Sequence, residues 1–497
     1  MQSFELFIDG AWRPAATGET YESINPATEE AWAVVSAGGT ADVNAAVAAA
    51  RRSFDSGVWR NKPASERAAI LRKMAEMLVD RQDELALYEV QDSGGTFRKA
   101  NMADIPASMQ TLTYYADLIE GFVAETEDAE FVPVESRNLV IKQPIGVVAA
   151  ITPWNFPLAA ATWKVAPALA AGCSIVLKPS PLTPVSTLIL AEIAFACGVP
   201  AGVLNVIAGP SDELGAALVS HPDIDKIAFT GSSKVGQAVM RIAADRLKPV
   251  TLELGGKSAN IILEDANLDG AIRGALFATF FHSGQICQSG TRLLVHRSLV
   301  AEVSARLVEE AKKIAVGDPM DIMNTFGPLI SERQRGTVER YVALAREEGA
   351  TCLLGGKRPE AFEKGYYYEP TIFGDVTNQM KAAREEIFGP VVCIIPFDTD
   401  EEAIAIANDS LYGLAGAVWT ADVERGLALA RRIDAGTVWV NDYHLLNPKY
   451  PFGGFKQSGF GRELSHEGLA IFQQTKHIHV GQPTGADTKI YFNLVID

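Results

Sequence analysis

Apolar residues follow one spacing up to about residue 145 and another beyond it. Over the first forty residues, short apolar runs alternate with turn residues, which predicts strands and hairpins. Helical spacing follows in residues 42–54 and 65–90. From residue 145, strand-like apolar runs alternate with helical patterns. The runs are VVAAIT at 147–152, SIVLK at 174–178, VLNVI at 203–207, KIAFT at 226–230 and TLELGG at 251–256, and the helical patterns lie at 159–171, 185–197 and 213–219.

This alternation predicts right-handed crossovers and a parallel sheet buried on both faces, hence an α/β fold with a doubly wound, Rossmann-like unit. A second α/β series follows Glu253 and contains ANIIL, TRLLVH, a long helix near 298–316, VVCIIPF, GLAGAVW and GTVWVN. We expect the two units to share a cleft, in which ligands bind near the carboxyl ends of the strands. The chain ends in strand-like YFNLVI, an exposed-edge segment that favours an oligomer.

Composition and charge narrow the function classes. With 48% hydrophobic and 21% charged residues, the 497-residue chain supports a sizeable core, which excludes disorder as its main state. The net charge of −17 predicts no binding to nucleic acid or to an anionic membrane. Residues 145–163 carry no charge, but Pro153 and Pro157 interrupt them, so we expect a strand, a turn and a helix instead of a membrane span.

The cysteines, histidines and N-terminus add three expectations. The five cysteines show no C-x-x-C spacing, so neither a disulfide scaffold nor a zinc site is predicted. The N-terminus lacks a basic region followed by an apolar run, so we expect no signal peptide and a cytoplasmic location. His477 and His479 lie two apart on a predicted strand, where a solvated face is the favoured interpretation, and no metal site is predicted.

Cys287 is the candidate nucleophile. It ends the segment FFHSGQIC, in which Gly284 permits a bend, and it leads into a predicted strand. Such a position exposes a thiol to a pocket and aims its backbone N–H at a developing oxyanion. The alternative is a small buried apolar residue, and we apply that interpretation to Cys173, Cys197, Cys352 and Cys393.

Glu253 and Asn155 are candidates for acid–base and oxyanion chemistry. Glu253 lies between two leucines at a strand end, where desolvation raises the pKa of a carboxyl group toward the range that a general base needs. Alternatively, it is a structural glutamate paired with Lys257. Asn155 lies on the proline-stiffened turn PWNFP, where its amide N–H₂ is suited to an oxyanion. The alternative is a hydrogen bond to the backbone of its own turn.

Two further features suit a cofactor. Lys178 ends the strand SIVLK, where a cation suits a ribose or a phosphate; alternatively, it is an edge lysine that reaches water. The segment GSSKVG at 231–236 follows a strand and precedes a helix, the setting in which a helix N-terminus faces a pyrophosphate. Its spacing is not G-x-G-x-x-G, so the glycines alone are weak evidence.

Six segments, in this order, resemble the aldehyde dehydrogenase superfamily: PWNFP, LKPS, FTGSSKVG, LELGGKS, GQIC and EEIFGP. The similarity runs from INPAT to PFGGFKQSGFGREL, and Cys287 follows Glu253 by 34 residues, the spacing of hydrolytic members. The resemblance implies an NAD(P)-binding domain in residues 1–122 and 145–253 and a catalytic domain in 254–455. It also implies an oligomerisation element and C-terminal tail in 123–144 and 456–497, which add strands to a partner chain in a dimer or tetramer.

The resemblance also implies a mechanism. Cys287 attacks the aldehyde carbon as a thiolate, Asn155 and the Cys287 N–H hold the oxyanion, and hydride passes to the nicotinamide. Glu253 then activates the water that hydrolyses the thioester, and Lys164 and Glu463 match a proton relay. Lys178 and Glu386 hold the two cofactor riboses, Phe388 packs near the nicotinamide, and Gly231 and Ser232 approach the pyrophosphate. Further cofactor contacts are expected from Ile151, Thr152, Pro153, Trp154, Ser180, Pro181, Phe229, Val235 and Leu254.

Two positions depart from the family pattern. Pro181 stands where many NAD-preferring members carry a glutamate that binds the adenosine ribose, so NAD is expected and NADP stays open. The sequence NDYH at 441–444 places Asp442 and His444 on a loop that usually lines the substrate tunnel. For His444 the alternative is a rim position that faces water. The tunnel is otherwise expected to be apolar, with Phe156, Trp163, Phe281, Ile286 and Phe452 as its lining.

The sequence therefore predicts oxidation of a medium-sized aliphatic or aromatic aldehyde to its acid, with NAD(P) as the oxidant. One alternative is a CoA-acylating dehydrogenase that releases the thioester to CoA. Such members generally lack the glutamate base, so Glu253 argues against it. The other alternative is a structural or stress protein that only retains the fold, against which Cys287, Glu253 and Asn155 together argue.

Overall fold

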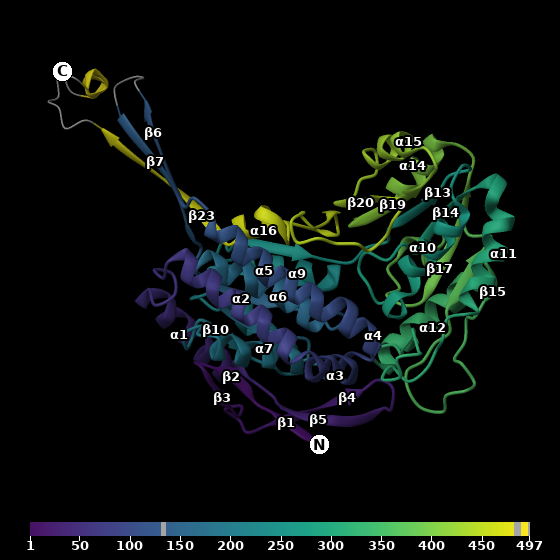
Figure 1. Ribbon diagram of the computed structural model, residues 1–497, viewed down its shortest axis with the longest axis horizontal. Helices are drawn as coiled ribbons and strands as arrows, with labels where there is room; N and C mark the ends of the chain where they lie inside the picture. The colour runs from purple at the N-terminus through teal and green to yellow at the C-terminus, as the bar shows by residue number, and fades with distance from the viewer. Residues whose placement is uncertain (131–135, 482–488, 496–497) are drawn as a thin grey trace.

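The computed structural model of the chain describes residues 1–130, 136–481 and 489–495. Two large sheets with their helices form the body, and a narrow arm extends from it (Figure 1). The first sheet has eight strands, in the order β22 (Gly459–Phe460), β12 (Val250–Glu253), β11 (Lys226–Thr230), β8 (Val147–Ile151), β9 (Ser174–Lys178), β10 (Leu204–Val206), β2 (Leu6–Ile8) and β3 (Ala11–Arg13).

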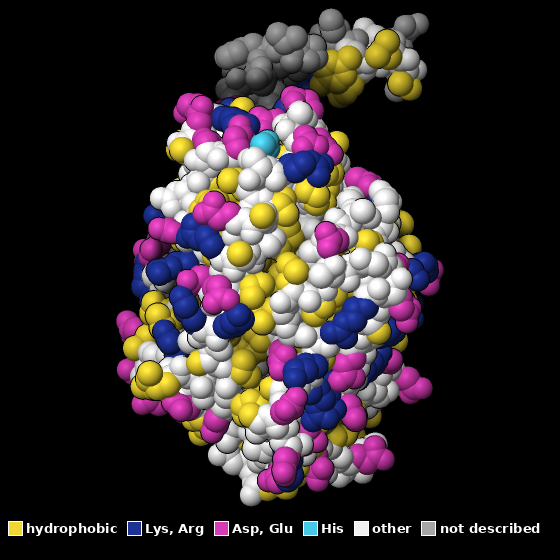
Figure 2. All heavy atoms as spheres, turned by 90° about the vertical axis from the view of Figure 1, so that its right-hand side faces the viewer, with side chains coloured by type: hydrophobic (Ala, Val, Ile, Leu, Met, Phe, Trp, Pro, Cys, Tyr) yellow, Lys and Arg dark blue, Asp and Glu magenta, His cyan; other side chains and the backbone are white. Residues whose placement is uncertain are grey.

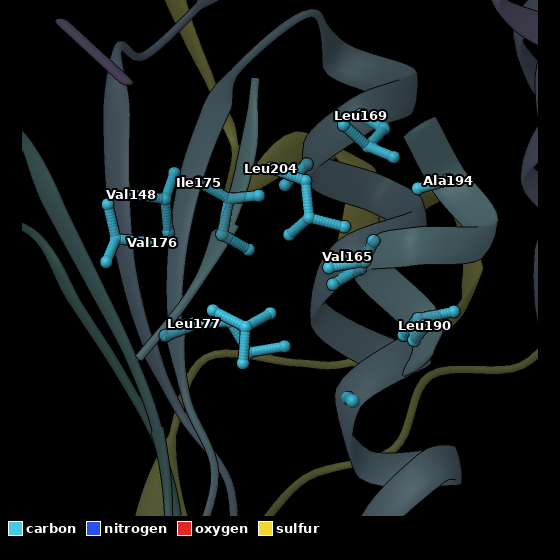
Figure 3. Close-up of a cluster of buried hydrophobic side chains, with 14 of the residues drawn as sticks. Val148, Val165, Leu169, Ile175, Val176, Leu177, Leu190, Ala194 and Leu204 are labelled. Atoms are coloured by element: carbon cyan, nitrogen blue, oxygen red, sulfur yellow. The ribbon is translucent and has the colours of Figure 1, made fainter. Parts of the chain in front are cut away.

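The five strands from β12 to β10 run parallel, so their carboxyl ends meet at one edge of the sheet. Helices α6 (Pro157–Ala171) and α7 (Val185–Ala196) pack on β9 and β10. Figure 3 shows Val165 of α6 and Leu190 of α7 on one side of this layer, with Ile175 and Leu204 of the strands on the other. All four side chains are buried, and each contributes about 1.5–3 kcal/mol by leaving water.

The remaining elements of this part surround that core. They are α1 (Thr40–Ser56), α2 (Ala64–Asp80), α3 (Gln82–Ser93), α4 (Phe97–Lys99), the π-helix η1 (Ala100–Asp104), α5 (Ile105–Glu120), α8 (Asp212–Ser220), α9 (Ser233–Ala244) and a small sheet in the order β1 (Gln2–Phe4), β5 (Glu30–Ser36), β4 (Thr20–Asn25).

The second sheet has seven strands and is parallel apart from its β15 edge. Its order is β15 (Thr351–Leu354), β16 (Thr371–Gly374), β17 (Val391–Phe397), β14 (Arg292–His296), β13 (Ala259–Ile262), β19 (Ala415–Trp419), β20 (Thr437–Val440). Its helices are α10 (Leu268–Phe280), η2 (Phe281–Gly284), η3 (Arg297–Leu299), α11 (Val300–Ala311), α12 (Glu332–Glu347), α13 (Lys381–Arg384), α14 (Asp400–Asn408) and α15 (Val423–Ala430). A small ladder joins β18 (Tyr412–Gly413) to β21 (Phe455–Lys456).

The arm consists of three antiparallel strands, β6 (Glu125–Glu130), β7 (Ser136–Pro144) and β23 (Gln473–Gly481), and α16 (Ser465–Ala470) precedes it. Beyond it, η5 (Ile490–Leu494) carries exposed Phe492 and Leu494. Figure 2 shows acidic and basic side chains interspersed over one face of the body. Within the described ranges, every helix is too short or too polar to cross a bilayer.

The expected α/β class and both sheets are confirmed, and two local expectations are wrong. The helical pattern at 65–90 is two helices, because Arg81 leaves the helical conformation and its guanidinium pairs with Glu84 and Glu192. The terminal YFNLVI is not a strand: residues 490–494 form a 3₁₀ turn, and residue 496 lies outside the described residues. The strand of the tail is β23, which finds a hydrogen-bonding partner in β7, and it carries the exposed His477 and His479.

Candidate active site

A cavity of about 350 Å³ collects segments that are far apart in the sequence. Its base is built from the turn after β8, the ends of β11 and β12, and the loop before β14. Its wall comes from α5, α6, α10 and residues 444–452. The lining residues are Met102, Ala103, Pro106, Ala107, Gln110, Pro153, Asn155, Phe156, Ala159, Ala160, Trp163, Thr230, Glu253, Leu254, Phe277, Phe281, Ile286, Cys287, Gln288, His444, Leu445, Leu446, Phe452 and Glu463.

Cys287 faces this cavity from the loop between η2 and β14. The loop can bend there because Gly284 adopts φ +74°, and a Cβ on Gly284 would lie 2.2 Å from the carbonyl oxygen of Gly389. Burial, followed by the charges of Glu386 and Glu253, raises the pKa of the Cys287 thiol far above its usual value. These surroundings therefore disfavour the expected thiolate form of Cys287.

The other four cysteines lie outside the cavity lining. Cys173, Cys197 and Cys393 are buried, as expected for small apolar residues. Cys352 is only half-buried and its thiol reaches the carbonyl oxygens of Leu354 and Gly355, so the apolar interpretation is incomplete for this position.

Asn155 joins the PWNFP turn to the cysteine loop. Its Nδ2 donates to the carbonyl oxygen of Gln285 at 2.9 Å, two residues before Cys287. The alternative, a bond within its own turn, is therefore wrong. An amide nitrogen carries two N–H groups, so a second donor remains on a side chain that lines the cavity.

Glu253 is a buried carboxyl group at the end of β12. Neither of its oxygens has a hydrogen-bond partner among the described residues, and Lys257, the alternative ion-pair partner, is likewise unpartnered there. Burial, followed by the negative charge of Glu463, raises the pKa of Glu253 well above its ordinary value, and Lys164 opposes this shift. The geometry therefore supports a proton acceptor over a structural ion pair.

Lys164 and Glu463 form a buried ion pair behind Glu253. The Lys164 ammonium also donates to Thr230 Oγ1 at 2.6 Å. Glu463 and Thr230 both line the cavity, whereas Lys164 is a buried residue of α6. The ion pair therefore links the base of the cavity to α6. The two candidate relay residues are thus brought together with the candidate base.

The expected cofactor residues gather at the carboxyl edge of the first sheet. Lys178 ends β9, which lies between β8 and β10, so the alternative of an edge lysine is wrong. Its side chain is buried, and its ammonium makes a long hydrogen bond of 3.4 Å to the carbonyl oxygen of Pro179. Ser232 caps α9 by accepting from the Val235 N–H at 3.4 Å, which leaves the first turn of that helix pointing at this edge.

The other expected contacts surround these groups at the same strand ends. Three of them end or directly follow a strand at this edge: Ile151, Thr152 and Leu254. Phe229 is the last but one residue of β11 and Gly231 follows that strand, while Ser180 and Pro181 follow β9. Thr152 has a buried hydroxyl without a partner in the described chain, and Val235 is exposed.

Glu386 and Phe388 precede β17 of the second sheet and contact segments that follow strands of the first sheet. Glu386 accepts from the Gly256 N–H at 3.0 Å, and burial raises the pKa of this carboxyl to about 7. The ring of Phe388 packs edge-on against Trp154 at 5.1 Å between centroids. Because Phe388 adopts φ +56°, a strained conformation for a residue with a side chain, its position is fixed by its surroundings.

All but one of the residues expected in the substrate pocket line the cavity. Phe156, Trp163, Phe281, Ile286, His444 and Phe452 line the cavity. Asp442 does not: it is exposed, and its carboxylate accepts the N–H of Tyr443 at 2.7 Å. His444 is half-buried instead of facing water at a rim, and burial lowers the pKa of its ring to about 3.

Several lining residues were missed by the sequence analysis. Ala103, Pro106, Ala107 and Gln110 recur at helical spacing along η1 and α5, and this stripe was the available signal. Gln288 follows Cys287 directly and had no signal of its own.

Two largely parallel sheets, with a half-buried thiol, a buried carboxyl and a buried amide at a shared cavity, define the fold and site of an α/β protein. A model of the aldehyde dehydrogenase family matches residues 12–478. The chain belongs to the aldehyde dehydrogenase family and is an oxidoreductase that acts on aldehydes.

Curated relatives and solved structures agree with this assignment. A betaine aldehyde dehydrogenase from Bacillus subtilis is 44% identical, over 95% of this chain and 96% of the relative. A chloroplastic aminoaldehyde dehydrogenase from Arabidopsis thaliana is 45% identical, with 96% of each covered. A Staphylococcus aureus betaine aldehyde dehydrogenase in complex with NAD+ superposes with a TM-score of 0.95, at 39% identity over 97% of this chain and 96% of that one.

Proposed function

We propose that the enzyme oxidises a free aldehyde to the carboxylic acid without CoA, with NAD+ as the oxidant and Cys287 as the nucleophile. The observation that carries the proposal is the convergence of Cys287, Glu253 and Asn155 on one cavity, from three separate segments of the chain. When bound, the nicotinamide of the cofactor accepts a hydride.

The residues at the carboxyl edge of the first sheet fit a dinucleotide. A buried ammonium at Lys178, the N–H groups that begin α9 and the carboxyl of Glu386 match the phosphates and hydroxyls of such a group. Related structures from Staphylococcus aureus and Bacillus cereus hold NAD+. Pro181 has no carboxylate that would repel the 2′-phosphate of NADP. Activity with NADP is therefore to be measured in parallel with NAD+.

The first chemical step joins the Cys287 sulfur to the aldehyde carbon. As the bond forms, the thiol proton moves to Glu253 in its carboxylate form, directly or through one water. The raised pKa of Glu253 makes this carboxylate a stronger base than an ordinary glutamate. The carbonyl oxygen becomes an oxyanion that Asn155 Nδ2 and the Cys287 N–H hold. In other enzymes one such donor is worth about 2.7–4 kcal/mol. Loss of hydride from the carbon then leaves a thioester on the sulfur.

The second step is hydrolysis. Glu253 takes a proton from a water, whose oxygen attacks the thioester carbon, and the C–S bond breaks to release the acid and restore Cys287. Glu253 has to release a proton twice, once after it accepts the thiol proton and once after it accepts the proton of the water. Both protons leave toward the Lys164–Glu463 pair, which lies next to Glu253. A CoA-acylating reaction would not need this base, so Glu253 favours hydrolysis.

Replacement of the nucleophile tests the proposal. Cys287→Ala is expected to reduce NADH formation from a panel of aliphatic and aromatic aldehydes by at least about 10³-fold, while NAD+ binding persists. Cys352→Ala is the matched control, because that thiol is also half-buried and lies away from the cavity. Acid formed without CoA is expected. Retained activity in Cys287→Ala, or thioester release to CoA, would overturn the assignment.

We also propose a homo-oligomer, a dimer or a tetramer, in which the arm contacts a partner chain. β23 and β6 are the two edges of the arm, and β23 is exposed along most of its length. Exposed edges of this kind are usually covered by another chain. Relatives include chloroplastic and peroxisomal proteins, so a cytoplasmic location stays a prediction.

A further inference from the structure

The cavity carries very little charge of its own. Among the described residues that line it, only Glu253 and Glu463 are acidic, and no lysine or arginine lines it. Both carboxyls lie at the base, where Glu463 is paired with Lys164. A negative charge for binding a cation is therefore missing along the wall of the cavity.

His444, the remaining titratable side chain of the wall, is held in its neutral form. Its Nδ1 accepts from Gln288 Nε2 at 2.9 Å, and its Nε2 donates to the carbonyl oxygen of Ala278 at 3.1 Å. With the Gln288 amide nitrogen as the donor, Nδ1 is the unprotonated nitrogen of a neutral ring, and burial, which lowers the pKa of the ring, favours the same form. The imidazole is thus satisfied as a neutral ring, and it contributes neither a positive nor a negative charge to the cavity.

The aromatic rings of the wall are largely engaged with each other or with a cation of the protein. The Lys99 ammonium lies 4.1 Å from the ring centroid of Phe156, so that ring already carries a cation. Phe277 packs edge-on against His444, and Trp163 packs edge-on against Phe452. The rings therefore offer limited cation–π binding to a substrate that would have to shed its water.

From these features we infer that the wall selects uncharged aldehydes and disfavours aldehydes that carry an ammonium group. Betaine aldehyde and aminoaldehydes, after which relatives of the chain are named, carry such a group. An ammonium ion held against the wall of this cavity, away from the two carboxyls at its base, loses hydration and gains no carboxylate partner. The inference rests on the proposed function and names the substrate class of the same site.

Pairs of aldehydes with the same shape and different charge test the inference on the native enzyme. One pair is 3,3-dimethylbutanal and betaine aldehyde; the other is butanal and 3-aminopropanal. In each pair kcat/KM is expected to be at least about tenfold higher for the neutral member. The ratio should be larger for 3-aminopropanal, because a primary ammonium is more strongly hydrated than a quaternary one. Equal or inverted ratios would overturn the inference, whereas no NADH from any aldehyde would overturn the proposed function.

A variant that supplies the missing charge sharpens the test. Gln110→Glu adds a carboxylate of the same shape on α5, at the exposed end of the cavity lining. It is expected to move the kcat/KM ratio toward the cationic aldehydes by about threefold, and added salt should weaken the effect. Gln237→Glu adds the same charge to an exposed site on α9, outside the lining, and should leave the ratio unchanged. An unchanged ratio in Gln110→Glu, or an equal shift in the control, would contradict the inference.

Discussion

The base and the wall of the cavity are built in different ways. The base brings together Glu253, Asn155 and Cys287 from strand ends and loops, and the carboxyl of Glu253 is buried without a hydrogen-bond partner in the described chain. Such an unsatisfied buried group costs about 1–3 kcal/mol. The wall consists of apolar helix faces whose burial stabilises the fold. The base is thus arranged for reaction at the expense of stability, while the wall serves both stability and shape.

Among changes at the base of the cavity, Glu253→Gln is expected to lower turnover most. This change should slow steady-state turnover by about 10²–10⁴-fold, because the neutral amide takes no proton from water. An acyl-enzyme should accumulate after the first turnover and be visible by mass spectrometry. Stability should fall little or rise, since a buried carboxyl without partners is removed.

The pH dependence gives a second measurement of the same residue. Because the pKa of Glu253 is raised, its carboxylate form is lost on acidification well above the range of an ordinary glutamate, and kcat/KM should rise with pH there. This rising limb should be absent from Glu253→Gln. Glu424→Gln, an exposed position on α15, is the control. Undiminished turnover in Glu253→Gln would contradict the assignment of the base.

Asn155→Ala should have the next largest effect. Loss of one oxyanion donor is expected to lower kcat by about 10²–10³-fold with little change in KM. The same change leaves the carbonyl of Gln285 without its donor, so thermal denaturation should show a loss of about 1–3 kcal/mol. A stability loss with unchanged kcat would show that the amide only ties the turn to the cysteine loop.

A change in the wall should reverse this pattern. Phe281→Ala widens the cavity between Phe156 and His444, and it is expected to raise KM for aromatic aldehydes by about tenfold while kcat stays similar. Steady-state kinetics with benzaldehyde and with acetaldehyde distinguish a loss of packing from a loss of chemistry. A fall in kcat for both substrates would show that Phe281, a residue of the wall, also affects the chemical steps at the base of the cavity.

The sequence was more informative about the base than about the wall. Cys287, Glu253 and Asn155 were recognisable because each lies in one of six motifs that follow the order of the aldehyde dehydrogenase superfamily, whereas the local pattern of each residue left an alternative open. Asp442 was expected in the tunnel because the loop at 441–444 usually lines it in the family, but here its carboxylate accepts from the Tyr443 N–H and the residue is exposed. Ala103 and Gln110 have no chemical signature, and they reach the cavity only because α5 packs against α6.

Long-range electrostatics were also beyond the sequence. Nothing local indicates that the Lys99 ammonium rests on Phe156, or that Glu463 is close enough to raise the pKa of Glu253. The break at Arg81 likewise depends on Glu192, which is distant in the sequence. Element types, in contrast, followed from apolar spacing in both sheets, because buried parallel strands require continuous apolar runs.

The smallest effect on turnover is expected from Glu463→Gln, and its direction is diagnostic. Glu463 raises the pKa of Glu253 and Lys164 lowers it, so removal of the negative charge should move the acidic limb of kcat/KM to lower pH. The variant also leaves Lys164 buried without its ion-pair partner, which should cost about 3–5 kcal/mol of unfolding free energy. A purely structural pair would show this stability loss with an unmoved limb. If the acidic limb of the kcat/KM profile moves to lower pH in Glu463→Gln and stays in place in Glu424→Gln, the charge of Glu463 influences the pKa of Glu253.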